Sequence, residues 1–353
     1  MSPLKKAWRW ILQQLSRRNP TVHTLGSQKW PISNLSGGLV AIALSFTVLF
    51  QACGGAATTD TYAGADSTIS DPAVEVPSED IPVVSQSNGN QSANKVDPLL
   101  QEHKGDKPTA TPIAIAQPTV PVTGQAVTYA TVDGTPVTGY LAQPTTPESD
   151  TLPAIITIHE WWGLNENIEA MTRRLAGEGY TVLAVDLYGD QIATEPDQAR
   201  ELMRSVMDNP APAQDNLFQA SEFLKSEYGA SALGSVGWCF GGNWSLRTGL
   251  LLSSELDAMA IYYGQLILAP EALDALDMPI IGFFGEDDSS IAVEDVNNFE
   301  SVLTDLGKDV DINLYPGVGH AFANPSGQNY AAAAAEDAWE KTPAFFAANL
   351  QSS

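Results

Sequence analysis

A series of continuous apolar runs, separated by segments with helical periodicity, constrains the fold of this chain more than any other feature. Helices are expected over 167–180, twice across 196–228, from about 241, over 293–306 and near 329–348. The apolar runs between them are PAIITI (153–158), TVLAV (181–185), ALGSVGW (232–238), AMAIYY (258–263), MPIIGFF (278–284) and the less apolar DVDINLY (309–315). This alternation predicts an α/β fold with a mostly parallel sheet and helices on both faces.

The folded domain is expected to cover residues 112–353. Its first part, AVTYATV (126–132) and TPVTGYLAQP (135–144), reads as a β-hairpin with Asp133-Gly134 in the turn. Residues 54–111 are rich in Ser, Thr, Asp, Pro, Gly and Ala and show no sustained periodicity. We therefore expect a disordered acidic and polar tether there, and His103 falls within it.

The N-terminal 53 residues carry an export signal pattern. Basic residues precede an apolar stretch over 39–50 that is too short to cross a bilayer as a mature helix. Cys53 follows Ala52 and precedes Gly54, which resembles the lipobox of bacterial lipoproteins. The pattern favours a lipoprotein signal in 1–53, lipidation of Cys53 and a membrane-anchored location outside the cytoplasm. The alternatives are ordinary signal cleavage, giving a secreted soluble protein, or an uncleaved anchor.

The charge of the remaining chain limits its partners. Six of the 17 Lys and Arg precede Cys53, whereas all 42 Asp and Glu follow it, so the remainder carries a formal charge of −31. Such a field repels nucleic acids and anionic membrane surfaces, so we expect membrane contact only through the N-terminal anchor. The chain has no Walker loop and no GxGxxG fingerprint. We expect no cofactor, a small-molecule partner and a monomer.

The segment GWCFGG (237–242) places a cysteine in a sharp turn between an apolar strand and a helix. This is the G-x-S-x-G pattern of the nucleophile elbow of α/β hydrolases, with Cys239 where serine usually stands. If Cys53 is lipidated, Cys239 has no disulfide partner within the chain. A buried cysteine that acts only as a small hydrophobe is the alternative.

A cysteine nucleophile needs a histidine that moves its proton and a carboxylate that orients the histidine. His320 lies in the glycine-rich segment YPGVGHAF, after the final apolar run, which fits the order nucleophile, acid, histidine. The acid is expected in GEDDSSI, after the strand that ends near Gly285. Asp287 and Asp288 compete for that role, and the hydrolase spacing favours Asp288.

The motifs HEWWGLN, DLYG, GWCFGG, YYG, GEDD and GHAFAN, in this order, resemble the dienelactone hydrolase family of α/β hydrolases, over about residues 123–350. The resemblance implies hydrolysis of a carboxylic ester or lactone through a thioacyl intermediate, with Cys239, His320 and Asp288 as the triad. It further implies that Glu160 holds the resting thiol. The backbone N–H groups of Trp161 and Phe240 would form the oxyanion hole.

Two positions depart from the family pattern. Members that act on dienelactone carry arginines where this chain has Asp190 and Asn324. Without these cations, an anionic lactone has no charged partner at either position. We therefore expect a neutral or apolar ester or lactone. The candidate pocket walls are the aromatic residues Trp161, Trp162, Tyr188 and Trp244.

Three other interpretations stay open at this point. The chain could be a catalytically silent extracytoplasmic binding protein on the same fold, or a cysteine peptidase. Cys239 could also be a redox sensor, although no resolving cysteine lies near it in the sequence. A metal site is not expected, because His159 and Glu160 are adjacent on a strand and point to opposite faces, and no further histidine is spare.

Overall fold

The computed structural model describes residues 98–106, 108, 116–149 and 151–351. All of them belong to the compact unit Pro72–Ser353. The predictions for residues 1–53, including the signal segment and lipidation of Cys53, lie outside the described residues and stay predictions. The same holds for the tether up to residue 97.

The described residues form eight strands and eight helices of at least four residues. The strands are β1 (Val122–Val132), β2 (Thr135–Pro144), β3 (Ala154–Ile158), β4 (Thr181–Val185), β5 (Leu233–Trp238), β6 (Ala258–Tyr262), β7 (Ile280–Gly285) and β8 (Val310–Tyr315). The helices are α2 (Pro98–Glu102), α3 (Glu166–Gly177), α4 (Pro196–Asp208), α5 (Ala211–Tyr228), α6 (Phe240–Leu251), α7 (Pro270–Leu273), α8 (Val293–Asp305) and α9 (Ala332–Leu350).

All eight strands belong to one sheet, in the order β1-β2-β4-β3-β5-β6-β7-β8. The pairs β1/β2 and β2/β4 are antiparallel, and the six strands β3 to β8 run parallel to one another. The central strands β3 to β7 are buried along their whole length, as their continuous apolar sequences predict. The predicted mostly parallel α/β sheet is therefore confirmed.

The β1–β2 hairpin turns at Asp133 and Gly134, whose φ angles of 49° and 76° are those of a left-handed turn. Tyr129 of this hairpin reaches the loop that follows β4 and helix α5. Its hydroxyl donates to Asn216 Oδ1 of α5 at 2.6 Å and accepts from the backbone N–H of Asp186 at 3.1 Å. The hairpin thereby supports the loop that follows β4.

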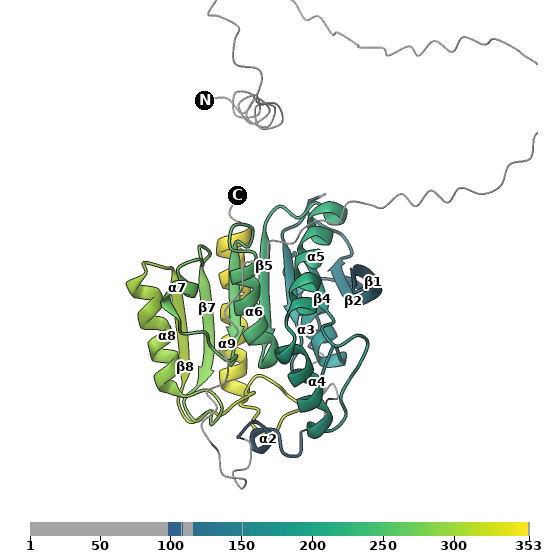
Figure 1. Cartoon of the computed structure of the whole chain (residues 1–353). Coiled ribbons are helices and arrows are strands. Elements are labelled where there is room, and N and C mark those ends of the chain that lie inside the picture. Colours follow the sequence, from purple (N-terminus) through teal and green to yellow (C-terminus); the bar gives the residue numbers. More distant parts are fainter. Residues whose placement is uncertain (1–97, 107, 109–115, 150, 352–353) are drawn as a thin grey trace, which may run out of the picture. The chain divides into compact units, whose positions relative to one another are not determined.

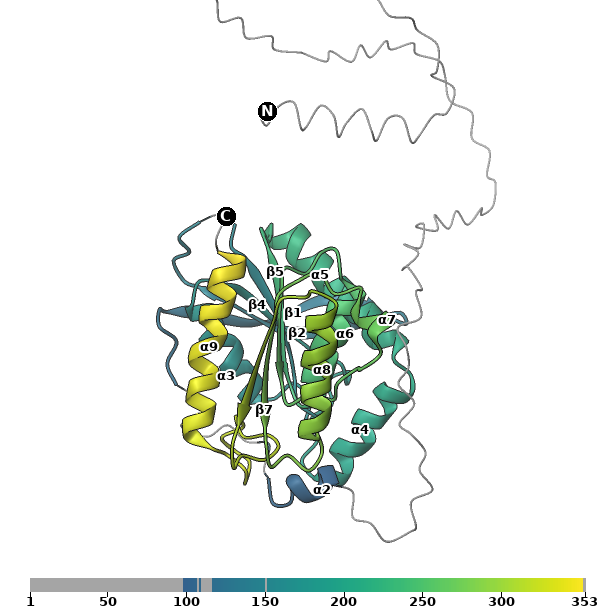
Figure 2. The ribbon, with the colours of Figure 1, turned by 90° about the vertical axis from the view of Figure 1, so that its left-hand side faces the viewer.

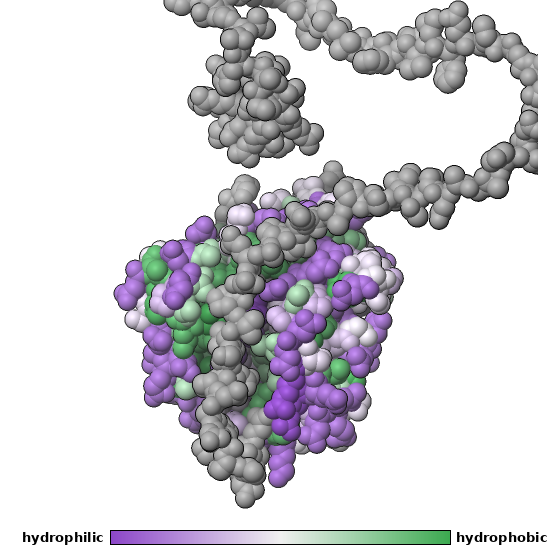
Figure 3. Space-filling view, in the orientation of Figure 1, coloured by the Kyte–Doolittle hydropathy of each residue, from purple (hydrophilic) through white to green (hydrophobic). Residues whose placement is uncertain are grey.

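Helices cover both faces of the sheet (Figures 1 and 2). Helices α3 and α9 lie on one face, and α5, α6 and α8 lie on the other, as the view in Figure 2 separates them. Two apolar cores result, one on each side of the sheet. On the face seen in Figure 3, the described surface is mostly hydrophilic, with smaller apolar areas among the hydrophilic residues. No helix in the described part of the chain is long and apolar enough to cross a bilayer.

The segment 98–106 is part of the folded unit. Helix α2 lies at the end of the sheet where the parallel strands terminate, in both views (Figures 1 and 2). His103 is fully buried, Glu102 accepts from the backbone N–H of Ser289 at 3.0 Å, and Asp106 accepts from the N–H of Gln328 at 2.7 Å. The expectation of a free tether up to residue 111 is therefore wrong for this segment, because buried and hydrogen-bonded side chains hold it against the domain.

Candidate active site

Cys239 lies in a strained turn between β5 and α6. Its φ and ψ angles are 56° and −114°, a region that residues with a Cβ rarely adopt. Close packing forces the turn. A Cβ added to Gly237 would lie 2.0 Å from the carbonyl oxygen of Gly241, and one added to Gly241 would lie 2.2 Å from that of Ile158. The two glycines of the G-x-C-x-G pattern are thus required to bring the start of α6 against the end of β3.

His320 and Asp288 come from two other strand ends, and His320 contacts both the sulfur and Asp288. His320 Nε2 lies 3.2 Å from Cys239 Sγ, and His320 Nδ1 lies 2.7 Å from Asp288 Oδ2. The other carboxylate oxygen of Asp288 accepts from the backbone N–H groups of Ser290 and Ile291, which fixes its orientation. Asp287, the competing acid, is exposed. The structure thus brings Cys239, His320 and Asp288 into one hydrogen-bonded chain.

The three groups change one another's ionisation. Burial alone would raise the pKa of the Cys239 thiol, but the charge of His320 and the imidazoles beside the sulfur outweigh it and lower the pKa to about 6. Burial would lower the pKa of His320, but the neighbouring sulfur and the hydrogen bond to Asp288 raise it well above its usual value. At neutral pH the site therefore favours a thiolate beside an imidazolium.

This ion pair predicts how fast an alkylating reagent modifies Cys239 at different pH values. In EDTA-treated protein, the rate of carbamidomethylation by iodoacetamide should rise through a midpoint near pH 6 and level off by pH 7, because the thiolate is the reactive form. In His320→Ala the midpoint should move above pH 8. Quantitative mass spectrometry of the peptide that contains Cys239 gives the rate. A wild-type midpoint above pH 8 would contradict the ion pair.

Glu160 lies beside the triad without contacting the sulfur through a hydrogen bond. Its carboxyl group accepts from the side-chain amide of Asn324 at 2.6 Å and from the hydroxyl of Tyr263 at 3.4 Å. Burial and the nearby charge of Cys239 raise the pKa of Glu160 to about 8. The structure therefore shows the sulfur held by His320, whereas the sequence resemblance implies a resting state held by Glu160.

His103 is the site residue that the sequence did not reveal. Its Nδ1 lies 2.7 Å from Asp106 Oδ2, and its ring packs against Trp161 at 4.4 Å and edge-on to His320 at 5.4 Å, centroid to centroid. Burial would lower the pKa of His103, but the hydrogen bond to Asp106 raises it above the ordinary value. The segment that carries His103 thus forms one wall over the triad.

The predicted oxyanion donors lie where the elbow meets the end of β3. Within the described residues, the backbone N–H groups of Trp161 and Phe240 donate no hydrogen bond to another protein atom. Such unpartnered backbone donors are rare in a buried setting. Both groups are therefore free to bind a negatively charged oxygen.

The predicted pocket walls are packed into the core. Trp161, Trp162 and Trp244 are fully buried, and Tyr188 is 5% exposed. Their polar atoms, three indole N–H groups and one hydroxyl, find no hydrogen-bond partner among the described residues. As the structure stands, these side chains fill space beside the triad and leave four buried polar groups for a water or a ligand.

Two observations bear on metal binding. Both nitrogens of His159 serve the fold, since Nδ1 lies 2.6 Å from the Glu160 carbonyl oxygen and Nε2 accepts from the N–H of Leu187 at 3.1 Å. However, ring nitrogens of His103 and His320 and the Cys239 sulfur all lie within 4.8 Å of one another. The expectation that no further histidine is spare is therefore wrong, because His103 reaches the site.

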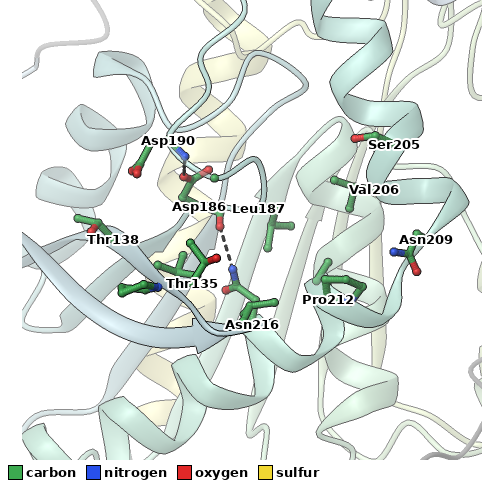
Figure 4. Close-up of a pocket in the computed structure, with 15 residues that line it drawn as sticks. Thr135, Thr138, Asp186, Leu187, Asp190, Ser205, Val206, Asn209, Pro212 and Asn216 are labelled. Carbon is green, nitrogen blue, oxygen red and sulfur yellow. Dashed lines mark hydrogen bonds between the residues drawn. The ribbon is translucent and has the colours of Figure 1, made fainter.

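A cavity of about 280 Å³ lies between the hairpin, the loop after β4 and helices α4 and α5 (Figure 4). On its wall, Asn216 donates to the backbone carbonyl of Asp186 at 2.8 Å. The carboxylate of Asp186 accepts from the N–H groups of Tyr188 and Asp190, so it holds the turn after β4. No residue of the triad lines this cavity.

Comparison with known proteins decides the family. The sequence profile of the dienelactone hydrolase family matches residues 137–350, well over half of the chain. The chain belongs to the dienelactone hydrolase family. Two relatives are similar to this chain along nearly their whole length. Protein usf of Aquifex pyrophilus is 33% identical over 221 residues, in a match that covers 61% of this chain and 94% of that protein. The "Putative carboxymethylenebutenolidase" of Escherichia coli is 30% identical over 264 residues, in a match that covers 69% of this chain and 95% of that protein.

Solved structures agree with the fold. The crystal structure titled "Putative Dienelactone Hydrolase" from Klebsiella pneumoniae matches with a TM-score of 0.58 at 24% identity. The match covers 64% of this chain and 99% of that one. The α/β-hydrolase fold is thereby established for this chain.

Proposed function

We propose that the protein hydrolyses a carboxylic ester or lactone, with Cys239 as nucleophile, His320 as proton carrier and Asp288 as the orienting acid. One observation carries the proposal. A sulfur at a strained strand-to-helix turn, an imidazole at 3.2 Å and a carboxylate at 2.7 Å from that imidazole form one continuous chain. This is the arrangement by which hydrolases activate a nucleophile.

In the first half of the reaction, the Cys239 sulfur attacks the carbonyl carbon and forms the C–S bond. The π electrons of the carbonyl move onto its oxygen, which the N–H groups of Trp161 and Phe240 stabilise. When the carbonyl re-forms, the bond to the leaving oxygen breaks. That oxygen takes the proton from His320 Nε2, and an acyl group remains on the sulfur.

In the second half, His320 Nε2 removes a proton from a water that attacks the thioester carbonyl. The C–S bond then breaks, the acid leaves, and the thiolate beside the imidazolium is restored. A neutral Glu160 favours this cycle, because a second negative charge beside the thiolate would raise the thiol's pKa. The hydrogen bond from Asn324 keeps the Glu160 side chain off the sulfur.

We propose that the substrate is neutral or apolar near its acyl carbon. The position expected to hold an arginine after the catalytic histidine carries Asn324, which is buried on Glu160, and the one after β4 carries the exposed acid Asp190. The buried indole N–H and hydroxyl groups of the predicted pocket walls are uncharged, so they supply no cation for a substrate carboxylate. This arrangement disfavours a substrate carboxylate at both positions.

A matched pair of esters tests the reaction and the substrate class together. We expect turnover of p-nitrophenyl butyrate with a kcat/KM roughly tenfold or more above that of p-nitrophenyl hemisuccinate, which carries a carboxylate on an acyl chain of equal length. The kcat/KM for the hemisuccinate should rise with salt as repulsion is screened, while that for the butyrate stays flat. A preference for the charged ester would contradict the substrate class. No turnover of either ester, or of a wider panel, would favour a silent binding protein.

A further inference from the structure

The buried imidazole of His103 has one nitrogen without a partner. Its side chain is fully buried, and its Nδ1 is bound to Asp106 at 2.7 Å. The Nε2 atom makes no hydrogen bond with any atom that the structure describes. A buried polar atom left without a partner costs free energy and often marks a place for a water or an ion. This nitrogen, on an imidazole that lies close to the Cys239 sulfur, is therefore free to bind a ligand.

Three atoms of the kind that bind transition metals meet at this point. The Cys239 sulfur and ring nitrogens of His103 and His320 lie within 4.8 Å of one another. A tetrahedral zinc ion, with bonds of about 2.3 Å to sulfur and 2.0 Å to nitrogen, holds two such ligands roughly 3.6 Å apart. The 3.2 Å between Cys239 Sγ and His320 Nε2 is already close to that separation.

Both histidines are oriented as metal-binding histidines are. His103 Nδ1 lies 2.7 Å from Asp106 and His320 Nδ1 lies 2.7 Å from Asp288, so each imidazole has a carboxylate on the nitrogen away from the sulfur. A carboxylate on that nitrogen fixes the ring and strengthens the other nitrogen as a ligand. Both carboxylate partners are at least nine-tenths buried, which excludes a loose surface arrangement.

We propose that Cys239, His103 and His320 bind one zinc-class divalent metal ion, with the fourth coordination position left for water. One thiolate and two neutral imidazoles bind zinc in preference to hard cations such as magnesium. Binding releases the protons that the sulfur and the imidazoles carry, and no atom is oxidised or reduced.

The three ligands come from separate segments of the chain. Cys239 follows β5 and His320 follows β8, whereas His103 follows α2 on the segment 98–106. That segment is held by Glu102, whose carboxylate accepts from Ser289 and from the side-chain amide of Asn329. A bound ion would tie the segment to the two catalytic loops.

The consequence for activity rests on the proposed function. A metal ion and an acyl group compete for the same sulfur lone pair, so the metal-bound protein should be inactive as a cysteine hydrolase. Metal binding itself does not depend on any ester being a substrate. The two proposals can therefore fail separately.

Equilibrium dialysis of the full chain, stripped with EDTA and then exposed to Zn²⁺ in excess Mg²⁺, tests the site. We expect one tightly bound Zn²⁺ per chain. His103→Gln should weaken this binding by about 100-fold or more, and Asp106→Asn by about 10-fold or more, because loss of a ligand or of its carboxylate partner lowers metal affinity. Lys104→Gln, an exposed change in the same segment, should leave the affinity unchanged. Equal affinity in wild type and His103→Gln would overturn the proposal.

Cobalt provides a second readout that a change in folding alone would not mimic. Co²⁺ added to the wild-type chain should produce a thiolate-to-cobalt charge-transfer band, which Cys239→Ala should abolish and His103→Gln should weaken. Circular dichroism establishes that each variant is folded. Absence of the band in the folded wild type would overturn the proposal. If Zn²⁺ binds but the metal-free protein hydrolyses no ester, the metal site stands and the proposed function fails.

Discussion

Replacing Cys239 with alanine is expected to lower kcat/KM for p-nitrophenyl butyrate on the order of 10⁴-fold or more, since no other group can form the acyl intermediate. The change removes one buried sulfur atom and leaves the elbow glycines in place. We expect it to alter the free energy of unfolding by only about 1 kcal/mol. Steady-state release of p-nitrophenol, with thermal unfolding of the same samples, measures both effects.

Cys53→Ala is the matched control, since Cys53 is the only other cysteine in the chain. It should leave the kcat/KM for the butyrate ester unchanged. If folded Cys239→Ala retained more than about a tenth of the wild-type activity, hydrolysis would not proceed through the sulfur. The proposed mechanism would then be wrong.

The second large effect is expected for Asp288→Asn. The amide keeps an oxygen to accept from the N–H groups of Ser290 and Ile291, so the loop should hold its shape. It cannot stabilise the imidazolium of His320 as a carboxylate does. We expect kcat/KM to fall on the order of 10³ to 10⁴-fold, as for the same change in a Ser-His-Asp triad, which corresponds to roughly 4 to 5.5 kcal/mol of barrier.

Asp287→Asn provides the comparison, because it makes the same chemical change at the exposed neighbouring position. It should change kcat/KM less than twofold. A further effect is expected when the alkylation rate of Cys239 is measured against pH in Asp288→Asn. Loss of the carboxylate lowers the pKa of His320, so less imidazolium is present to stabilise the thiolate, and the midpoint should move to higher pH. Equal losses of kcat/KM in Asp287→Asn and Asp288→Asn would mean that the loop as a whole is needed and that neither acid has a specific role.

The sheet was predictable from the sequence because its central strands are apolar along their whole length. TVLAV and MPIIGFF have no polar alternation, and such runs between helical segments fit only a sheet covered on both faces. Chain order and glycine spacing also sufficed to select Asp288 over Asp287 as the acid that meets His320. Each of these inferences depends on the order and type of residues along the sequence.

His103 could not be found in this way. Its segment, PLLQEHKGD, contains a five-residue helix, which is too short to show a helical period. What holds it are contacts to residues more than 180 positions away, at Ser289 and Gln328. Such long-range polar contacts leave no periodic signal, so a composition rich in polar residues favoured a tether.

The surroundings of Glu160 show a similar limit. The resemblance placed Glu160 beside the nucleophile, but it did not indicate that Asn324 and Tyr263 would occupy its carboxyl group. The aromatic residues Trp162, Tyr188 and Trp244 were predicted to be pocket walls because they lie near predicted strand ends. All three side chains are packed in the core. Residue type alone does not distinguish a pocket wall from a core residue, because both are large and apolar.

Detection of the acyl group on the sulfur tests the central proposal most directly. His320→Ala should be mixed with p-nitrophenyl butyrate at alkaline pH, where the thiolate forms without the imidazole and p-nitrophenolate leaves without a proton. Deacylation should be slow, since no base activates water. Intact-protein and peptide mass spectrometry should then show one butyryl group on Cys239, removable by neutral hydroxylamine. A butyryl group on another residue during turnover, with Cys239 unmodified, would contradict the thioacyl mechanism.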